Sequence, residues 1–386
     1  MTTESQSNHL RAKRPQPKPR LQSLDALRGF DMFWILGAEG LFAALFVLTG
    51  WAGWQWFDAQ MHHSAWHGMT FYDLIFPLFI FLSGVALGLS VKRLDQQPWS
   101  QRKPVYVHAI KRLLLLLILG VIYNHGWGGG IPAELSQIRY SSVLARIAFA
   151  WFIAAMLVWH TSLRTQVITV VGLLVGYSVL LMLVPVPNGE AGQLTLEGSI
   201  NTYIDSLLRP GISYQNLPLD PEGVLSHIPA AVNAIVGSFV GRFIVSQQPK
   251  GEWFKAAMLA LSGVIAIALG YGLSGVIPIN KSLWTSTFVL VTLGWSMLIL
   301  AVFYSMIDIL KWRKWAFGFV VIGTNAIIIY LATSLINWQY LAQSLFGGVI
   351  NAVPEVVQPL LTVCTLLVVQ WLALYWLYKR KIFIRI

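Results

Sequence analysis

The chain has 386 residues, of which 56% are hydrophobic and only 11% are charged. Soluble globular domains carry roughly 25% charged residues, so this composition excludes an ordinary water-soluble domain. The single cysteine, Cys364, excludes a disulfide framework and a CxxC metal site. The net charge of +11 is compatible with nucleic-acid binding, but the distribution of the basic residues points to a membrane surface instead.

Ten apolar stretches are each long enough to cross about 30 Å of hydrocarbon as a helix. We therefore predict an all-α fold, a polytopic membrane bundle of about ten transmembrane helices. Residues 1–22 are expected to form a disordered cytoplasmic tail, and residues 23–386 a single transmembrane domain. In chain order, the expected spans are 30–50, 72–91, 105–123, 143–160, 166–187, 224–246, 254–273, 284–304, 316–336 and 357–378.

The basic residues indicate an orientation for these spans. With the N-terminus inside, 23 of the 27 Lys and Arg residues lie in or beside cytoplasmic segments and only 4 lie on the opposite side. This is a strong positive-inside bias, and an even number of spans places both termini in the cytoplasm. We expect a multi-pass protein of a bacterial inner membrane whose basic rim faces anionic lipids, without a nucleic-acid partner.

The first span carries ionisable residues, which are costly inside a membrane and usually functional. Arg28 and Glu39 are eleven residues apart, which in a straight helix places them within about 20° of each other. Asp25 lies on the same side. This face could line a substrate passage, or Glu39 could form a structural ion pair with Arg146.

The first outside loop, 51–71, contains four Trp and three His residues but no Lys or Arg. Histidine can accept a proton near neutral pH, so His62, His63 and His67 are candidates for a general base or nucleophile. They could equally be ordinary interfacial residues. Only Asp58 lies at metal-ligand spacing, and we predict no metal site.

Two further groups have more than one interpretation. Gly126 and Gly128–Gly130 follow the third span but lack the spacing of a phosphate-binding fingerprint, so they predict a turn. Lys111 and Arg112, at the cytoplasmic start of that span, could bind a phosphate or simply anchor the helix at the membrane surface.

Several landmarks occur in a fixed order along the chain. Their joint order resembles the heparan-α-glucosaminide N-acetyltransferase family of transmembrane acyltransferases, which has bacterial members. The landmarks are R-L-Q-S-L-D-A-L-R-G at 20–29, H-S-A-W-H-G-M-T at 63–70, D-L-I-F-P at 73–77, Arg139 with Val143, Leu144 and Arg146, D-P-E-G at 220–223, P-I-N-K-S-L-W at 278–284, and Asn325.

The resemblance places the family's catalytic histidine at His63, whereas His62 and His67 do not match the motif position. The family's Asn, eleven residues after the R-G arginine, is replaced here by Glu39, which could accept a proton or bind an ammonium group. Ser141, Ser142 and Ala145 replace the Pro-Gly and Gln of the fourth-span motif.

The resemblance also implies the substrates. Acetyl-CoA would be the donor and would enter from the cytosol with its phosphates near Arg28, Lys111 and Arg112. The amine of a glucosamine-type sugar would be the acceptor on the periplasmic side. Asp73 is expected to orient the imidazole or the acceptor. Asn280 and Lys281, with Trp66 of the histidine motif, are expected to contact the acceptor at the outside mouth.

Four points remain open. His63 could remove a proton from the acceptor so that the amine attacks directly, which we favour, or it could carry the acetyl group covalently. A sugar transporter without chemistry is an alternative from another class, although no internal repeat is visible. O-acylation of a surface polysaccharide would change only the acceptor. A homodimer is an open alternative to a monomer.

Overall fold

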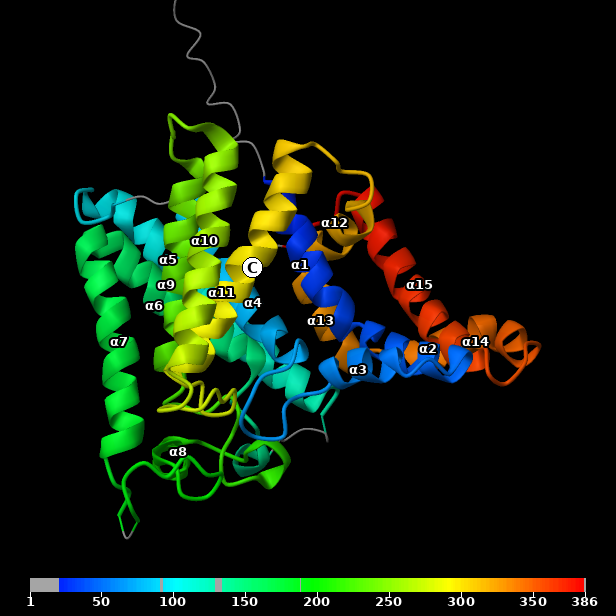
Figure 1. Ribbon diagram of the computed structural model, residues 1–386, viewed down its shortest axis with the longest axis horizontal. Coiled ribbons are helices and arrows are strands. Elements are labelled where there is room, and N and C mark those ends of the chain that lie inside the picture. The colour runs from blue at the N-terminus through cyan, green and yellow to red at the C-terminus, as the bar shows by residue number, and fades with distance from the viewer. Residues whose placement is uncertain (1–20, 91–92, 129–133, 188, 385–386) are drawn as a thin grey trace, which may run out of the picture.

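A computed structural model describes residues 21–90, 93–128, 134–187 and 189–384 (Figure 1). Within these ranges the elements are helical, and the backbone forms β-type pairing only at an isolated bridge between Arg139 and Gly211. The all-α prediction is therefore confirmed. Of the predicted tail, residues 1–22, all but the last two residues lie outside the described part of the chain.

Seven helices are long and apolar enough to cross a membrane individually. Each matches a predicted span to within a few residues, except that α5 begins six residues before the predicted third span. They are α5 (Trp99–His125), α6 (Val143–His160), α7 (Leu163–Leu183), α9 (His227–Val245), α10 (Gly251–Gly272), α11 (Ser286–Phe303) with its π-helical extension η5 (Tyr304–Ile309), and α15 (Gln358–Lys379).

Three further apolar elements complete the predicted set of about ten. Two are helix pairs that together could form bent spans, and the third is a shorter helix. They are α1 (Gln22–Ile35) with η1 (Ala38–Gly40) and α2 (Leu41–Thr49), α12 (Phe317–Thr324) with α13 (Ala326–Leu335), and η2 (Tyr72–Leu74) with α4 (Ile75–Gly88).

The first predicted span is not a straight helix, because it bends by 65° between Ile35 and Ala38. Gly37 sits in this break with φ +114°, a conformation that glycine adopts without the clash that a Cβ would cause. The helical angle that placed Arg28 and Glu39 on one face therefore does not apply past the break. The prediction of a continuous polar face is wrong for this physical reason.

The second bent pair, α12 and α13, meets at Asn325 with an angle of 71°. A break within an apolar region is tolerated when other protein groups satisfy polar backbone atoms. The Asn325 amide donates to the carbonyl of Ile382 at 3.0 Å and accepts from the N–H of Ile384 at 3.2 Å. The C-terminal residues Ile382 and Ile384 are thus tied to the break.

Close helix packing depends on glycines at a spacing of four residues. On α4, a Cβ at Gly84 would lie 2.0 Å from the carbonyl oxygen of Ala234, and one at Gly88 would lie 2.2 Å from that of Ser238. The facing helix, α9, carries Gly237 and Gly241 in the same spacing. Small residues let helix backbones approach closely in membranes, where apolar burial drives association less than it does in water.

Several short elements lie in segments that we expected to be loops. Of these, α3 and α14 extend sideways from the main bundle, together with α2 of the first bent span (Figure 1). The unpredicted elements are α3 (Gly53–Gln60), η3 (Leu135–Gln137), α8 (Ile200–Leu208), η4 (Tyr214–Asn216) and α14 (Trp338–Asn351).

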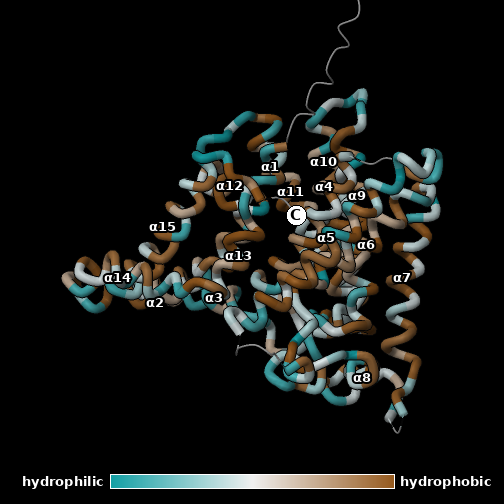
Figure 2. Tube along the Cα trace, turned by 180° about the vertical axis from the view of Figure 1, so that it is seen from behind, coloured by the Kyte–Doolittle hydropathy of each residue, from teal (hydrophilic) through white to brown (hydrophobic). Residues whose placement is uncertain are grey.

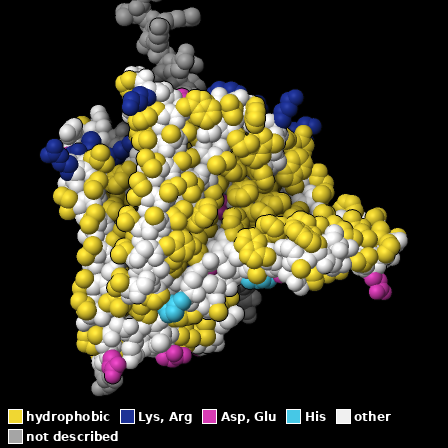
Figure 3. Space-filling model, viewed as in Figure 1, with side chains coloured by type: hydrophobic (Ala, Val, Ile, Leu, Met, Phe, Trp, Pro, Cys, Tyr) yellow, Lys and Arg dark blue, Asp and Glu magenta, His cyan; other side chains and the backbone are white. Residues whose placement is uncertain are grey.

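Hydropathy and charge vary along the direction of the long helices. Apolar residues run along the helices, and hydrophilic residues gather in the segments that join them (Figure 2). On the face shown in Figure 3, Lys and Arg side chains lie at one end, and Asp, Glu and His side chains lie toward the other. Together with the apolar helices, this distribution is that of a multi-pass membrane protein.

Candidate functional site

The segment between α3 and α4 is organised around Asp73, whose side chain is completely buried. One carboxylate oxygen, Oδ2, accepts the backbone N–H groups of Ser64 and Thr70, each at 3.1 Å, and the Thr70 hydroxyl at 3.2 Å. The other oxygen, Oδ1, lies 2.8 Å from Nδ1 of His63. One carboxylate thus fixes the loop and holds the histidine.

Lys281 joins this pair from the segment between α10 and α11. Its Nζ lies 2.9 Å from Nδ1 of His63, 3.3 Å from Nε2 of the same ring and 3.3 Å from Oδ1 of Asp73. Burial lowers the pKa of the Lys281 ammonium, an effect that the nearby carboxylates of Asp73 and Glu222 oppose. We name these three residues, His63, Asp73 and Lys281, the histidine cluster.

The histidine cluster borders a cavity of about 250 Å³. Its polar end is formed by His63, Lys281, Tyr72 and Glu222, and the Tyr72 ring lies 4.9 Å from the His63 ring. The remaining walls come from α1, α4, α5, α6 and α13 and are mostly apolar. They are formed by Met32, Ile35, Ile75, Phe76, Phe79, Tyr123, Val143, Leu144, Ile147, Ala326, Ile327 and Tyr330.

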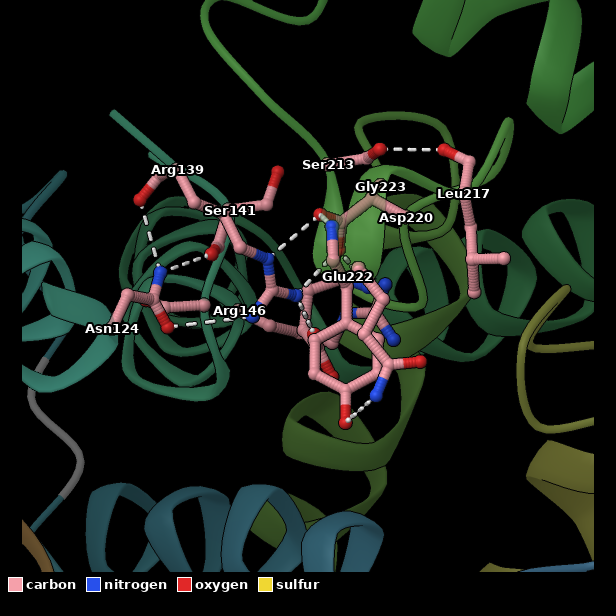
Figure 4. Close-up of polar contacts among 12 residues, drawn as sticks. Asn124, Arg139, Ser141, Arg146, Ser213, Leu217, Asp220, Glu222 and Gly223 are labelled. Atoms are coloured by element: carbon pink, nitrogen blue, oxygen red, sulfur yellow. Dashed lines mark hydrogen bonds and ion pairs between the residues drawn. The ribbon is translucent and has the colours of Figure 1, made fainter. Parts of the chain in front are cut away.

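Glu222 also belongs to a second group of charged residues (Figure 4). The Arg139 guanidinium donates to both oxygens of Asp220, at 2.7 and 2.9 Å, and to Oε2 of Glu222 at 2.6 Å. Burial raises the pKa of Asp220, but the hydrogen bonds and charge of Arg139 outweigh this and hold it below its usual value. We name Arg139, Asp220 and Glu222 the arginine cluster.

Arg146 is also completely buried, at the start of α6 (Figure 4). Its Nη2 donates to the Ser226 hydroxyl, and the guanidinium lies 4.5 Å from the centre of the Trp284 ring. Among the described residues, it forms no ion pair with Glu39, so the structural pair that we considered for these two residues is absent. Its Nε and Nη1 have no hydrogen-bond partner there either.

Glu39 lies at the break between α1 and α2, close enough to His62 for their charges to interact. Its Oε2 is buried without a hydrogen-bond partner in the described part of the chain. Glu39 does not line the cavity that contains His63. The structure therefore places it near the histidine loop but apart from the histidine cluster.

The predicted phosphate-binding residues separate into two groups. Arg28 and Arg112 lie near enough for their charges to interact, although they come from different helices. Arg28 also lies 3.8 Å from Asp25, and Arg112 stacks over the Trp151 ring at 4.0 Å with its Nε unpartnered among the described residues. Lys111 is exposed on the adjacent face of α5.

Two residues predicted to contact the acceptor hold loops together. Asn280 is completely buried, and its amide donates to the Trp66 carbonyl at 2.9 Å and accepts from the N–H of Leu283 at 2.8 Å. The Trp66 indole donates to the Leu194 carbonyl at 2.8 Å. Neither side chain lines the cavity, so the structure brings only His63, Asp73 and Lys281 of the predicted site together.

Sequence reasoning assigned no role to three residues that the structure makes conspicuous. Tyr72 and Glu222 line the polar end of the cavity; Glu222 lies within the D-P-E-G landmark, and Tyr72 lies between two landmarks. Asp31 of α1 is fully buried, with one carboxylate oxygen unpartnered in the part of the chain described. A carboxylate inside an apolar helix was the available signal for Asp31.

Together, the fold and the cavity define a multi-pass helical membrane protein with a His–Asp–Lys cluster at the polar end of an apolar cavity. Residues 20–197 match a family model described as a domain of unknown function (DUF5009). The chain is 28% identical over 421 aligned residues to the heparan-alpha-glucosaminide N-acetyltransferase of Mus musculus and 27% identical over 366 to that of Homo sapiens.

These alignments cover 96% and 81% of this chain, but only 62% and 52% of the two relatives. The chain thus corresponds to little more than half the length of the curated relatives it matches. The similarity confirms the family resemblance that the motifs indicated: over most of its length, the chain is similar to these two heparan-alpha-glucosaminide N-acetyltransferases.

Proposed function

We propose that this protein is a transmembrane N-acetyltransferase that transfers an acetyl group from acetyl-CoA to the amine of a glucosamine-type sugar. The observation that carries the proposal is the histidine cluster at the polar end of the apolar cavity. The activity named for both relatives supports the reaction class. No metal takes part in this proposal.

In the proposed mechanism, His63 is the general base. With a proton on Nδ1 the ring donates to Asp73, which leaves the lone pair of Nε2 to accept a proton from the acceptor amine. The amine nitrogen then bonds to the acetyl carbonyl carbon, the carbon–sulfur bond breaks, and the proton on His63 passes to the departing sulfur. Asp73 positions the ring, and Lys281 pairs with Asp73. Covalent transfer through an acetylated His63 is the other route.

The residues present fit the donor. The apolar walls of the cavity suit an acyl-pantetheine arm, and the stacked Tyr123 and Tyr330 rings, 4.2 Å apart, stiffen one side. Arg28 and Arg112 suit the phosphates, because guanidinium groups replace the water lost by an anion. The unpartnered Nε of Arg112 supports this placement. Lys111, which is exposed, would add only to the surrounding positive potential.

The proposed orientation has the Lys- and Arg-rich end and both termini in the cytoplasm of a bacterium, and the histidine cluster toward the periplasm. The positive-inside distribution supports this orientation. The acetyl group would then cross the membrane while the sugar and CoA stay on their own sides. Asn280 and Trp66 would shape the periplasmic mouth by holding its loops, and Glu39 would tune the histidine loop from the break beside it.

A transporter is the second candidate, because transport proteins often use broken helices near the membrane midplane and the described part of this chain has two bent helix pairs. One experiment separates the two functions. The protein is reconstituted in sealed vesicles with glucosamine trapped inside and labelled acetyl-CoA outside.

If the protein is an acetyltransferase, labelled N-acetylglucosamine forms inside the vesicles, and its formation depends on His63. Escape of unmodified glucosamine without acetylation would overturn the proposal in favour of transport. A parallel reaction with glucose, which has a hydroxyl in place of the amine, tests O-acylation: comparable product from glucose would reject N-specific transfer.

A further inference from the structure

The cavity contains opposite charges at its polar end. Of the residues that line it, Glu222 is the carboxylate and Lys281 is the lysine. Lys281 lies beside His63, and Glu222 lines the same cavity near enough for its charge to act on Lys281. An acceptor amine is an ammonium ion at neutral pH, so it needs an anionic partner when it leaves water.

Glu222 is held in place by hydrogen bonds to Asp220 and Arg139. Its backbone N–H donates to Oδ1 of Asp220 at 2.9 Å, and its Oε2 accepts from Arg139 at 2.6 Å. No hydrogen bond to Oε1 occurs within the described ranges, and the side chain is 11% exposed and lines the cavity. One oxygen therefore anchors the carboxylate while the other remains available to a ligand.

We infer that Glu222 is the recognition residue for the acceptor's ammonium group. This inference rests on the proposed function and adds the residue that selects a cationic acceptor. Oε1 of Glu222 accepts a hydrogen bond from the ammonium and presents a second N–H to His63. His63 takes one proton from the ammonium and releases it to water, and the neutral nitrogen bonds to the acetyl carbonyl carbon. As the carbon–sulfur bond breaks, a second proton passes from the nitrogen through His63 to the sulfur. Glu222 keeps its charge throughout.

The geometry also explains why Arg139 does not cancel this role. Arg139 already donates to both oxygens of Asp220, so its charge is shared between two carboxylates. Within the arginine cluster two carboxylates share one guanidinium, so Glu222 keeps part of its negative charge, although Lys281 and the buried Arg146 also interact with that charge. A charge-assisted hydrogen bond to that charge is worth roughly tenfold or more in affinity.

The test compares Glu222→Gln with the unchanged protein, using two acceptors. Glucosamine is charged at neutral pH, whereas hydroxylamine is a neutral nucleophile. We expect the KM for glucosamine to rise about tenfold or more, while the KM for hydroxylamine and the Kd for acetyl-CoA change less than about threefold. Glu190→Gln removes an exposed carboxylate from the loop between α7 and α8 and should change none of these constants.

An equal rise in KM for both acceptors, or no rise for either, would overturn the inference. If Glu222→Gln does not fold, Glu222→Asp serves instead, because it keeps the charge but shortens the reach. It should raise the KM for glucosamine selectively but less steeply, and a nonselective change would count against the inference.

Failure of the proposed function is recognised separately. If the unchanged protein acetylates neither amine, the acetyltransferase proposal fails. Glucosamine binding to the unchanged protein and to Glu222→Gln is then measured by equilibrium dialysis without acetyl-CoA. Weaker binding to the variant would still support ammonium recognition, whereas equal binding would reject it.

Discussion

The histidine cluster and the arginine cluster are built from the same parts but differ in what they leave free. Each centres on a completely buried aspartate with a basic partner from a distant loop. Arg139 occupies both oxygens of Asp220, and the N–H groups of Tyr214 and Glu222, both at 2.9 Å, complete its shell. Asp73 instead shares one oxygen between two basic groups, His63 and Lys281, that border the cavity.

The comparison indicates how to separate scaffolding charges from reacting ones. A buried ion pair whose hydrogen-bonding groups are all satisfied fixes loops, and its loss lowers the stability of the folded protein. A cluster whose donors and acceptors face a cavity can exchange a proton with a ligand. The histidine cluster should therefore respond to mutation in catalysis, and the Arg139–Asp220 pair in stability.

The largest expected effect is at His63. His63→Ala should lower acetyl transfer by about 10²–10⁴-fold, the usual contribution of a general base, while acetyl-CoA binding changes little. His62→Ala and His67→Ala are matched controls in the same loop and should lose far less. Steady-state kinetics and calorimetric binding of acetyl-CoA measure the two quantities. Full activity in His63→Ala would contradict the site assignment.

Asp73→Asn should reduce transfer on the order of 10²-fold, because a catalytic group that is slightly misplaced typically loses that much. Its role is positioning, so the fold-decrease in kcat should exceed the fold-change in the KM for either substrate. The pH profile of kcat should also change shape. Asp58→Asn is the control, since Asp58 pairs with His62 at 3.5 Å instead of His63. An unaltered pH profile together with lower protein stability would show that Asp73 only anchors the loop and does not position His63.

Asp220→Asn should chiefly destabilise the protein, by about 3–5 kcal/mol, because it leaves the buried charge of Arg139 less well paired. The pKa of Asp220 is held below its usual value of 3.8, so the stabilisation is fully present above about pH 4 and is lost as the pH falls further. Thermal unfolding in detergent at neutral and acidic pH measures this. The gap between the variant and the unchanged protein should narrow on acidification, and a constant gap would contradict the assignment.

The smallest of these effects is expected far from both clusters. Arg28→Glu should weaken acetyl-CoA binding at least tenfold, about 1.4 kcal/mol, by reversing the charge that faces the donor phosphates. Lys103→Glu, an exposed charge reversal on α5, is the control and should have little effect. Equal affinity for acetyl-CoA in the unchanged protein and in Arg28→Glu would move the phosphate site elsewhere.

Much of the fold could be predicted because each membrane span is recognisable from its own local sequence. Each of the long helices is encoded by its own apolar run, and the structure confirms them. The breaks were less visible, because Gly37 and Asn325 become helix breaks only through a backbone conformation and a contact with the C-terminal residues. The short α3 and α14 were missed because interfacial aromatic residues also occur in loops.

By itself, the sequence determined the membrane class, the approximate spans and the importance of the histidine motif, because composition and local order carry that information. Only the tertiary structure decided which charges meet. Lys281 reaches His63 across 218 residues of chain, and Arg139 reaches Asp220 across 81. Local periodicity cannot encode such contacts, since they depend on how the bent spans and outside loops pack together, and the bend after Ile35 removed Glu39 from the face that a straight helix would have given it.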